Sequence, residues 1–407
     1  CGSEELAFLA ESFGRLPLPR LDDRRGFHRR HRDKEALKRL LEHLLRESGA
    51  VTAAVDDEVE RTNHDPDLLH AILERQNYRL AFWRTAARDL GYRRFFDVNS
   101  LVALRAEDER VFAETHVLVL DWLRHGGLDG VRVDHPDGLR EPQAYFERLR
   151  AAAPEAWIVV EKILMPGEAL PAAWPVQGTT GYDFGNLVLG LFVDPRAEAA
   201  LSRLYGGFTG RETSFAAEAR EKKRLVLHDV LGGDLSRLTA HLLEVCERHR
   251  QHRDYTRHEL HEALRELMAA LPVYRTYVRA EQGALGDDDR ARIDAALAAA
   301  TAARPDLEAS LFTFIGSILK LEVRGDLETE LVMRFQQATG PVTAKGVEDT
   351  AFYTYNRLVC LNEVGGDPGR FGVGPQEFHR WCEETAGRHP QTLLATATHD
   401  SKRGEDV

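Results

Sequence analysis

The chain has 407 residues, of which 29% are charged, and its formal net charge is −12 at pH 7. This length is sufficient for one large barrel or for two to three ordinary domains. The acidic balance without a long basic block disfavours nucleic acid as a partner, and the lack of an apolar run near the ~20 residues of a membrane span disfavours a membrane.

The first part of the chain is predicted to consist of loop and helix. Residues 1–30 are rich in Gly, Pro, Arg and His, which indicates loop with a short helix. Leucines at helical spacing predict an amphipathic helix over 34–46. Asp65 and Pro66 form an N-cap followed by proline at the first helical position, and we expect this helix to run to about Asp89.

The next part of the chain alternates between strand and helix. The aromatic stretch 92–99 predicts a strand that either packs under a loop or forms a substrate wall. The elements predicted after it are a helix over 108–125, a strand over 128–134, a helix over 143–153 and a strand over 157–161. Both later strands end on a carboxylate. This repetition favours a parallel sheet in an α/β barrel, whose chemistry lies at the carboxyl ends of the strands.

A long helical block separates these strands from the end of the chain. Residues 194–328 have a helical pattern, with the clearest helices over 235–245 and 287–303. Since barrel loops are normally short, this block is predicted to be an inserted subdomain. Strand-like apolar runs return over 358–361 and 392–398.

Three acids, Asp134, Glu161 and Asp400, each follow a predicted strand. Cleavage of a glycosidic bond with retention needs a carboxylate nucleophile and a protonated acid about 5–5.5 Å apart, and adjacent strands lie about 4.8 Å apart. Asp134 and Glu161 can therefore form such a pair, and a third carboxylate nearby favours the protonated state of Glu161. Arg132, on the same face as Asp134, would keep it ionised, and His399 could donate to a sugar hydroxyl.

Three other interpretations of these residues remain open. A single carboxylate at a strand end is usually only solvated. The neighbouring His and Asp residues could bind a metal, as in metal-dependent phosphohydrolases, although the other histidines complete no familiar ligand spacing. A carbohydrate-binding protein with inactive acids would carry the same residues.

Several segments of the chain resemble a known enzyme family. Those that resemble the second, third and fourth signature regions of α-amylase-type glycoside hydrolases (family 13) are Asp129–Leu139, Val159–Lys162 and Thr398–Asp400. Longer motifs resemble the maltooligosyltrehalose synthases within that family. These motifs are Tyr92–Asp97, Arg132–Leu139, Gly178–Phe184, Ala344–Tyr353, Leu361–Pro368 and His399–Asp406. The resemblance extends over about residues 65–407.

The resemblance assigns roles to residues of this chain. Asp134 matches the nucleophile, Glu161 the general acid/base and Asp400 the stabiliser of the transition state. Arg132 and His399 match residues beside the sugar on the donor side. Further residues that fall in family motifs and are expected near the substrate are His135, Asp137, Lys162, Tyr182 and Asp183.

Other residues of the motifs have an open role or depart from the family. Lys345, Glu348 and Asp349 either line the site or form a structural ion-pair network. Ser401 stands where the family has threonine, and the first signature region, an Asn-His strand end, is absent. The resemblance thus implies a partial (β/α)8 TIM barrel with a large helical insertion, without the N-terminal strands and the last strand, and with exposed edges.

The expected organisation has four parts. They are a helical or loop region over 1–90, a barrel segment with the nucleophile and the acid/base over 91–193, an inserted helical subdomain over 194–340, and a barrel segment ending at the third carboxylate over 341–407. The chain begins at Cys1 rather than methionine and ends in a charged stretch at Val407. We therefore expect an internal fragment of a longer protein, inactive by itself because part of its site is missing.

The resemblance implies an isomerase that acts by intramolecular transglucosylation. It would convert the reducing-end α-1,4 linkage of a maltooligosaccharide into an α,α-1,1 linkage, which forms maltooligosyltrehalose in trehalose biosynthesis. The alternative is a sister α-glucan hydrolase or 4-α-glucanotransferase with the same carboxylates. No metal or organic cofactor is implied, and a maltooligosyltrehalose trehalohydrolase is an expected partner. Four scattered cysteines without a C-x-x-C pair favour the reducing cytoplasm.

Overall fold

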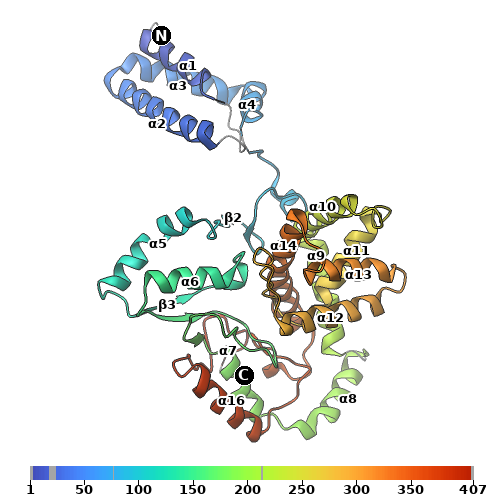
Figure 1. Ribbon diagram of the computed structural model, residues 1–407. Coiled ribbons are helices and arrows are strands. Elements are labelled where there is room, and N and C mark those ends of the chain that lie inside the picture. Colours follow the sequence, from blue (N-terminus) through green and yellow to red (C-terminus); the bar gives the residue numbers. More distant parts are fainter. Residues whose placement is uncertain (1–2, 18–23, 77, 212–213, 405–407) are drawn as a thin grey trace. The chain divides into compact units, whose positions relative to one another are not determined.

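A computed structural model describes residues 3–17, 24–76, 78–211 and 214–404 (Figure 1). The chain divides into two compact units, Cys1–Phe82 and Trp83–Val407. The described part of the first unit is helical. Its helices are α1 (Glu4–Gly14), α2 (Arg24–Glu47), α3 (Gly49–His64) and α4 (Pro66–Leu73).

Two sequence predictions for the first unit need correction. Helix α2 begins at Arg24, well before residue 34. The prediction missed its first half because that half is charged and lacks apolar periodicity. Helix α4 begins as predicted, with the Asp65 side chain accepting hydrogen bonds from two backbone N–H groups. It ends at Leu73 rather than near Asp89. No residue of α4 is buried, so little packing supports a longer helix.

The second unit is rich in helices and contains few strands (Figure 1). Its strands are β1 (Arg94–Phe95), β2 (Val98–Val102), β3 (Gly130–Val133), β4 (Trp157–Val160) and β5 (Gly178–Thr179). Its α-helices are α5 (Glu109–Arg124), α6 (Pro142–Ala152), α7 (Tyr182–Leu191), α8 (Glu198–Thr209), α9 (Phe215–Asp229), α10 (Gly232–Arg248), α11 (Arg257–Ala270), α12 (Asp287–Ala303), α13 (Ala309–Leu319), α14 (Asp326–Thr343), α15 (Phe352–Thr354) and α16 (Pro375–Arg388). It also contains the 3₁₀-helices η1 (Trp83–Ala87), η2 (Pro136–Gly138), η3 (Pro195–Ala197) and η5 (Val359–Leu361), and the π-helix η4 (Ala344–Ala351).

Strands β3, β4 and β5 form a parallel sheet in that order. The register pairs Val133 with Val160 and Val160 with Thr179, so all three strands end at the same edge. Only glycine fits at the first position of β3, because a Cβ on Gly130 would lie 2.1 Å from the backbone oxygen of Trp157. The predicted alternation of strand and helix over 108–161 is confirmed.

The aromatic stretch near residue 95 forms a short hairpin rather than one strand. β1 and β2 pair in antiparallel orientation, and Phe96 at the turn has φ of 48°. The prediction of a strand over 92–99 was therefore correct in type but wrong in extent.

The two strand-like runs near the end of the chain are not strands. Residues 359–361 form the 3₁₀-helix η5. The run at 392–398 lies beside β5, where the Leu393 N–H donates to the Thr179 carbonyl at 3.3 Å. The Thr392 side chain, rather than a backbone carbonyl, accepts from the Thr179 N–H at 3.0 Å. Among the described residues the parallel sheet therefore has three strands and does not close into a barrel.

The two largest of the hydrophobic clusters in the second unit support the helical block and the sheet. The larger core joins α9 to α14 and confirms the helical block that the sequence predicted, including the helices over 235–245 and 287–303. The smaller core packs α5 and α6 against the sheet through Phe112, Phe146, Ile158 and Val160. The sheet and the helical block thus lie within one unit, and each contributes residues to the pocket described next.

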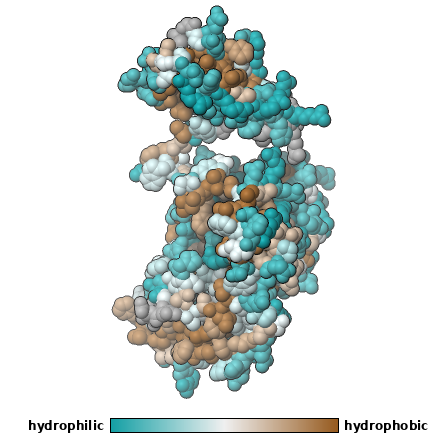
Figure 2. Space-filling model, turned by 90° about the vertical axis from the view of Figure 1, so that its left-hand side faces the viewer, coloured by the Kyte–Doolittle hydropathy of each residue, from teal (hydrophilic) through white to brown (hydrophobic). Residues whose placement is uncertain are grey.

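Part of the second unit's surface is apolar. On α5, Val117, Leu118 and Trp122 are exposed, as is Leu128 before β3. Figure 2 views the side on which α5 lies in Figure 1 and shows hydrophobic surface among polar residues. No helix in the described ranges is long and apolar enough to cross a membrane.

Candidate active site

A pocket of about 290 Å³ lies at the carboxyl ends of β3 and β4. Asp134 and Glu161, which follow these strands, contribute one wall. The π-helix η4 contributes a second wall, and the turn that carries Asp400 contributes a third. The three acids predicted from the sequence therefore line a single pocket, although Asp400 lies 239 residues beyond Glu161 in the chain.

Asp134 forms an ion pair with Arg132. The Arg132 guanidinium donates to Asp134 Oδ1 at 2.6 Å. Both side chains project from the same side of β3, as the alternation along a strand requires. The Asp134 side chain remains 58% exposed, so a bound substrate could reach its second oxygen.

Glu161 favours its protonated form. Removal from water raises the pKa of Glu161 to about 8, and the nearby carboxylates of Asp134 and Asp137 act in the same direction. Opposing this, the backbone N–H of His135 donates to Glu161 Oε2 at 2.7 Å. At neutral pH the carboxyl therefore holds a proton, as a general acid must.

His135 combines a strained backbone with a buried ring. Its φ of 45° places it in the left-handed region, and this turn directs its N–H toward Glu161. The ring contacts Phe95 and Phe96, with centroid separations of 5.5 and 4.9 Å. Burial lowers the pKa of His135, so the ring is neutral. Gly138 is required opposite it, since a Cβ there would lie 2.5 Å from the imidazole.

Asp400 is oriented by two neighbouring side chains. The Tyr182 hydroxyl donates to Asp400 Oδ2 at 2.7 Å. His399 Nε2 lies 3.2 Å from the same oxygen. Burial raises the pKa of Tyr182 to about 12, so its hydroxyl keeps the proton that it donates.

Asp137 and Lys162 belong to a buried network beneath the pocket. Lys162 is 1% exposed, lies 3.5 Å from Asp137 Oδ2 and 3.1 Å from Glu168 Oε1, and donates to the Ile163 carbonyl. The Tyr277 hydroxyl donates to Asp137. Asp137 reaches the pocket wall, whereas Lys162 points to the opposite side from Glu161.

Asp183 lies apart from the other predicted site residues. It sits in the first turn of α7, where the Thr179 hydroxyl donates to its Oδ1 at 2.8 Å. It lines a different pocket, together with residues of α16. The structure therefore brings Asp134, Glu161, Asp400, His135 and Asp137 to one pocket, with Arg132, Tyr182 and His399 bonded to or lining it, but not Lys162 or Asp183.

Comparison with known proteins identifies the family. No family model matches the chain. A curated relative from Mycobacterium tuberculosis (strain H37Rv), whose name includes maltooligosyl trehalose synthase, is 39% identical over 338 residues, which is 83% of this chain. The maltooligosyltrehalose synthase structure from Arthrobacter ramosus is 40% identical, with a TM-score of 0.74 over 84% of the chain. The chain belongs to the maltooligosyltrehalose synthase family.

The similarity covers less than half of these relatives. The chain spans 41% of the length of the curated relative and 42% of the Arthrobacter ramosus structure. A second maltooligosyl trehalose synthase structure is 30% identical, with a TM-score of 0.61, and 38% of it is covered. The family is therefore established for this chain, while the activity of a whole synthase is treated below as a proposal.

The π-helix η4 contributes residues whose role the sequence left open. Glu348 accepts a hydrogen bond from the Tyr274 hydroxyl, and burial raises the pKa of Glu348 to about 7. Lys345 Nζ lies 3.1 Å from Asp349 and 3.1 Å from Asp97. Both earlier interpretations therefore apply in part, because all three residues line the pocket and Lys345 and Asp349 also form ion pairs. π-Helical turns occur frequently at functional sites.

Sequence reasoning missed Glu363, which fixes the turn after Asp400. Its carboxylate accepts hydrogen bonds from the backbone N–H groups of Lys402, Arg403 and Gly404, at 2.5, 3.0 and 3.3 Å. Lys402 in turn lies 2.7 Å from Asp349. Glu363 falls in the motif Leu361–Pro368, so the motif signalled its presence but not its contacts.

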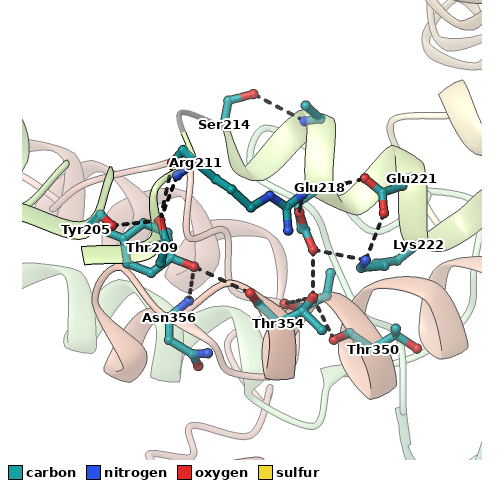
Figure 3. A network of polar contacts seen from close by, with 12 residues as sticks. Tyr205, Thr209, Arg211, Ser214, Glu218, Glu221, Lys222, Thr350, Thr354 and Asn356 are labelled. Carbon is teal, nitrogen blue, oxygen red and sulfur yellow. Dashed lines mark hydrogen bonds and ion pairs between the residues drawn. The ribbon is translucent and has the colours of Figure 1, made fainter. Parts of the chain in front are cut away.

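A second buried network holds the far end of η4 (Figure 3). Glu218 on α9 is 1% exposed and accepts from the Thr354 hydroxyl at 2.8 Å. Lys222 lies 3.2 Å from the same carboxylate, and the Tyr205 hydroxyl accepts from the Asn356 N–H at 3.1 Å. These bonds tie α8 and α9 to the segment that follows η4, so the helical block positions this wall of the pocket.

No group of three or more His, Cys, Asp or Glu residues within the described ranges is arranged to hold a metal ion. The histidines nearest the acids have other partners. His135 packs against two aromatic rings, and His399 lies against Asp400.

Proposed function

We propose that this chain supplies the catalytic carboxylates of a maltooligosyltrehalose synthase. The reaction is an intramolecular transglucosylation that replaces the reducing-end α-1,4 linkage of a maltooligosaccharide with an α,α-1,1 linkage. One observation carries the proposal: a protonated Glu161 lines the same pocket as Asp134, which is paired with Arg132. A retaining glycosidase mechanism needs such a pair, a protonated general acid and a carboxylate nucleophile.

In the first half of the reaction, Asp134 attacks the anomeric carbon of the penultimate glucose. Glu161 donates its proton to the departing glycosidic oxygen, so the terminal glucose leaves as a neutral molecule. Asp400 stabilises the positive charge that develops on the sugar ring. The product of this half is a glycosyl ester on Asp134 together with a free glucose.

In the second half, the released glucose stays in the pocket and turns over. Glu161, now ionised, removes the proton from its anomeric hydroxyl, and the resulting oxygen attacks the glycosyl carbon. The bond to Asp134 breaks and the α,α-1,1 linkage forms. Water must be excluded during this turn, and the wall built by η4 and the helical block is suited to that role.

The remaining predicted site residues receive roles according to their place. Arg132 holds the Asp134 carboxylate through an ion pair, and Tyr182 and His399 orient Asp400. His135 acts through its backbone N–H on Glu161. Asp137 and Lys162 support the pocket from below as positioning residues. For Asp183, its contact with Thr179 supports a role in holding α7 rather than in binding sugar.

We also propose that β3, β4 and β5 are consecutive strands of a (β/α)8 barrel. Their parallel order and shared carboxyl edge support this, as does the segment at 392–395 beside β5. The four-part organisation, with a boundary near residue 90 and an inserted subdomain over 194–340, is part of the same proposal. A cytoplasmic location and a trehalohydrolase acting on the product complete it.

The test uses a full-length protein that contains these 407 residues, incubated with maltopentaose. Reducing ends should disappear without an equal release of glucose, and Asp134→Asn should abolish the loss. Persisting reducing ends would instead support an α-glucan hydrolase or a 4-α-glucanotransferase. An Asp134→Asn variant as active as the wild type would indicate inactive acids, and loss of activity with a chelator would indicate a metal-dependent hydrolase.

A further inference from the structure

A second pocket shares Phe96 with the candidate active site. Its volume is about 420 Å³, within the range of small-molecule sites. It is lined by the hairpin region, the loop after η2 and the helices α10 and α14. Six arginines and three carboxylates line it, an excess of three positive charges in a chain whose net charge is −12.

Four of these arginines have partners within the protein. Arg334 pairs with Glu330, and Arg140 lies 2.9 Å from the same carboxylate. Arg105 lies 3.4 Å from Glu107. Arg237 donates to the Leu90 carbonyl at 2.8 Å. The positive charge of these side chains is therefore largely satisfied without a ligand.

Arg93 and Arg94 differ from the others, since neither forms an ion pair with any carboxylate in the described part of the chain. Arg93 makes one long hydrogen bond, 3.4 Å to the Gln337 carbonyl. Burial, together with the charge of Arg275, lowers the pKa of Arg93 to about 10, although the carboxylates of Asp234 and Glu107 act in the opposite direction from a distance. Arg94 donates to the Asn99 side chain and to the backbone carbonyls of Asp97 and Val230, but its Nε is buried without a hydrogen-bond partner.

A guanidinium withdrawn from water without a counter-charge costs free energy. Arginine side chains also bind phosphate through two parallel hydrogen bonds, which suits this site better than a diffuse anion. The lining also includes apolar side chains, among them Leu231 and Leu238. The pocket therefore has room for an uncharged body attached to a charged group.

We propose that this pocket binds a small phosphate-bearing ligand through Arg93, with Arg94 beside it. The shared chemistry is a phosphate group, which either a sugar phosphate or free inorganic phosphate would present. The proposal does not depend on the function proposed above. It would place the ligand next to Phe96, which also lines the candidate active site.

Calorimetric titration of the 407-residue chain tests the proposal with three probes: inorganic phosphate, glucose 6-phosphate and glucose. The two phosphate-bearing probes should bind and glucose should not. Tighter binding of glucose 6-phosphate supports a sugar phosphate, and equal binding supports free phosphate. The Arg93→Gln variant should bind about tenfold more weakly or worse. The control Arg110→Gln alters an exposed arginine of α5 outside the pocket and should bind as the wild type does.

Thermal unfolding gives a second readout. Without ligand, Arg93→Gln should be at least as stable as the wild type, because it removes a largely buried charge that forms no ion pair and only one long hydrogen bond. Phosphate should raise the melting temperature of the wild type but not that of the variant. If Arg93→Gln does not fold, Arg93→Lys decides, since lysine keeps the charge but loses the paired donors: weaker binding supports the site and unchanged binding overturns it. Absence of binding by the wild type, or equal binding by Arg93→Gln and Arg110→Gln, also overturns the proposal.

Discussion

At the scale of single residues, the carboxyls of the candidate active site differ through their surroundings rather than their chemistry. Glu161 and Glu348 are withdrawn from water, which raises their pKa values to about 8 and about 7. Asp134 is half exposed beside a guanidinium. The same pocket thus holds a carboxylate paired with a guanidinium beside buried carboxyls of raised pKa, the division of labour that glycosidic chemistry uses.

This division predicts how stability depends on pH. The pKa of Glu161 is raised on folding, so its protonated form stabilises the folded chain fully below about pH 4.5. That contribution is lost as the pH rises toward 8, because the unfolded chain releases the proton earlier. Urea unfolding at pH 5, 6, 7 and 8 should show the decline, and Glu161→Gln should flatten it. An equally steep decline in the variant would contradict the assignment. Glu281→Gln, at an exposed position, serves as the control.

Sequence reasoning located the acids but not all of their neighbours. Asp134 and Glu161 could be placed together because adjacent parallel strands end at one edge. Tyr274 and Glu363 could not be predicted, because their contacts depend on how the helical block and the late loops fold back on the sheet. Lys162 was assigned to the site by its motif, but alternation along the chain turns it inward.

At the scale of elements, the turn that carries Asp400 depends on Glu363. Three consecutive N–H groups donate to this carboxylate, which takes the place of regular secondary structure in holding the turn. The segment 392–399 just before Asp400 is not a strand, so the position of Asp400 relies on this contact and on Tyr182.

Replacing Glu363 should therefore loosen the turn without unfolding the chain. In Glu363→Gln, one oxygen is lost as an acceptor, and the amides of residues 402–404 should exchange hydrogen about tenfold faster. Exchange measured by mass spectrometry or NMR checks this. The matched variant Glu377→Gln removes a carboxylate of α16 that pairs with Arg370 in the preceding loop, and it should leave these amides unchanged. Unchanged exchange in Glu363→Gln would show that the turn is held by other contacts.

The π-helix η4 packs closely against α9. A Cβ at Gly346 would lie 2.8 Å from the Cα of Lys223, a backbone atom that cannot move aside easily. We expect Gly346→Ala to destabilise the chain by about 1–3 kcal/mol in urea unfolding. Gly207→Ala on α8 is the control, since no atom lies within 4 Å of its added Cβ. That variant should gain about 0.5–1 kcal/mol from helix propensity. Equal effects of the two variants would contradict the packing argument.

At the scale of the whole molecule, the helices were predictable and the sheet only partly so. Local signals such as amphipathic spacing in α10, the closing glycines after α5 and the alanine-rich, charged composition of α12 identified these helices. The runs at 358–361 and 392–398 are apolar enough for strands, but neither forms the complete set of backbone hydrogen bonds with a neighbouring strand. Pairing between distant segments is not encoded in local composition, so these two predictions failed.

The division into two compact units predicts independent folding of the second unit. Residues 83–407 contain both hydrophobic cores that surround the sheet and the helical block. Expressed alone, this segment should melt within a few degrees of the same transition in the 407-residue chain. Scanning calorimetry compares the two. A large drop in melting temperature would show that residues 1–82 are required for the fold of the remainder.

The left-handed turn at His135 has a consequence for how the site can be engineered. The group that contacts Glu161 is a main-chain N–H, so no substitution at position 135 other than proline deletes it. In a library of side chains at position 135, the surviving residues would therefore be those that tolerate positive φ and fit against Phe95 and Phe96. Asn and Gly tolerate positive φ best. The main-chain hydrogen bond that lowers the pKa of Glu161 would remain in nearly every member of such a library, so comparing its members would not reveal it.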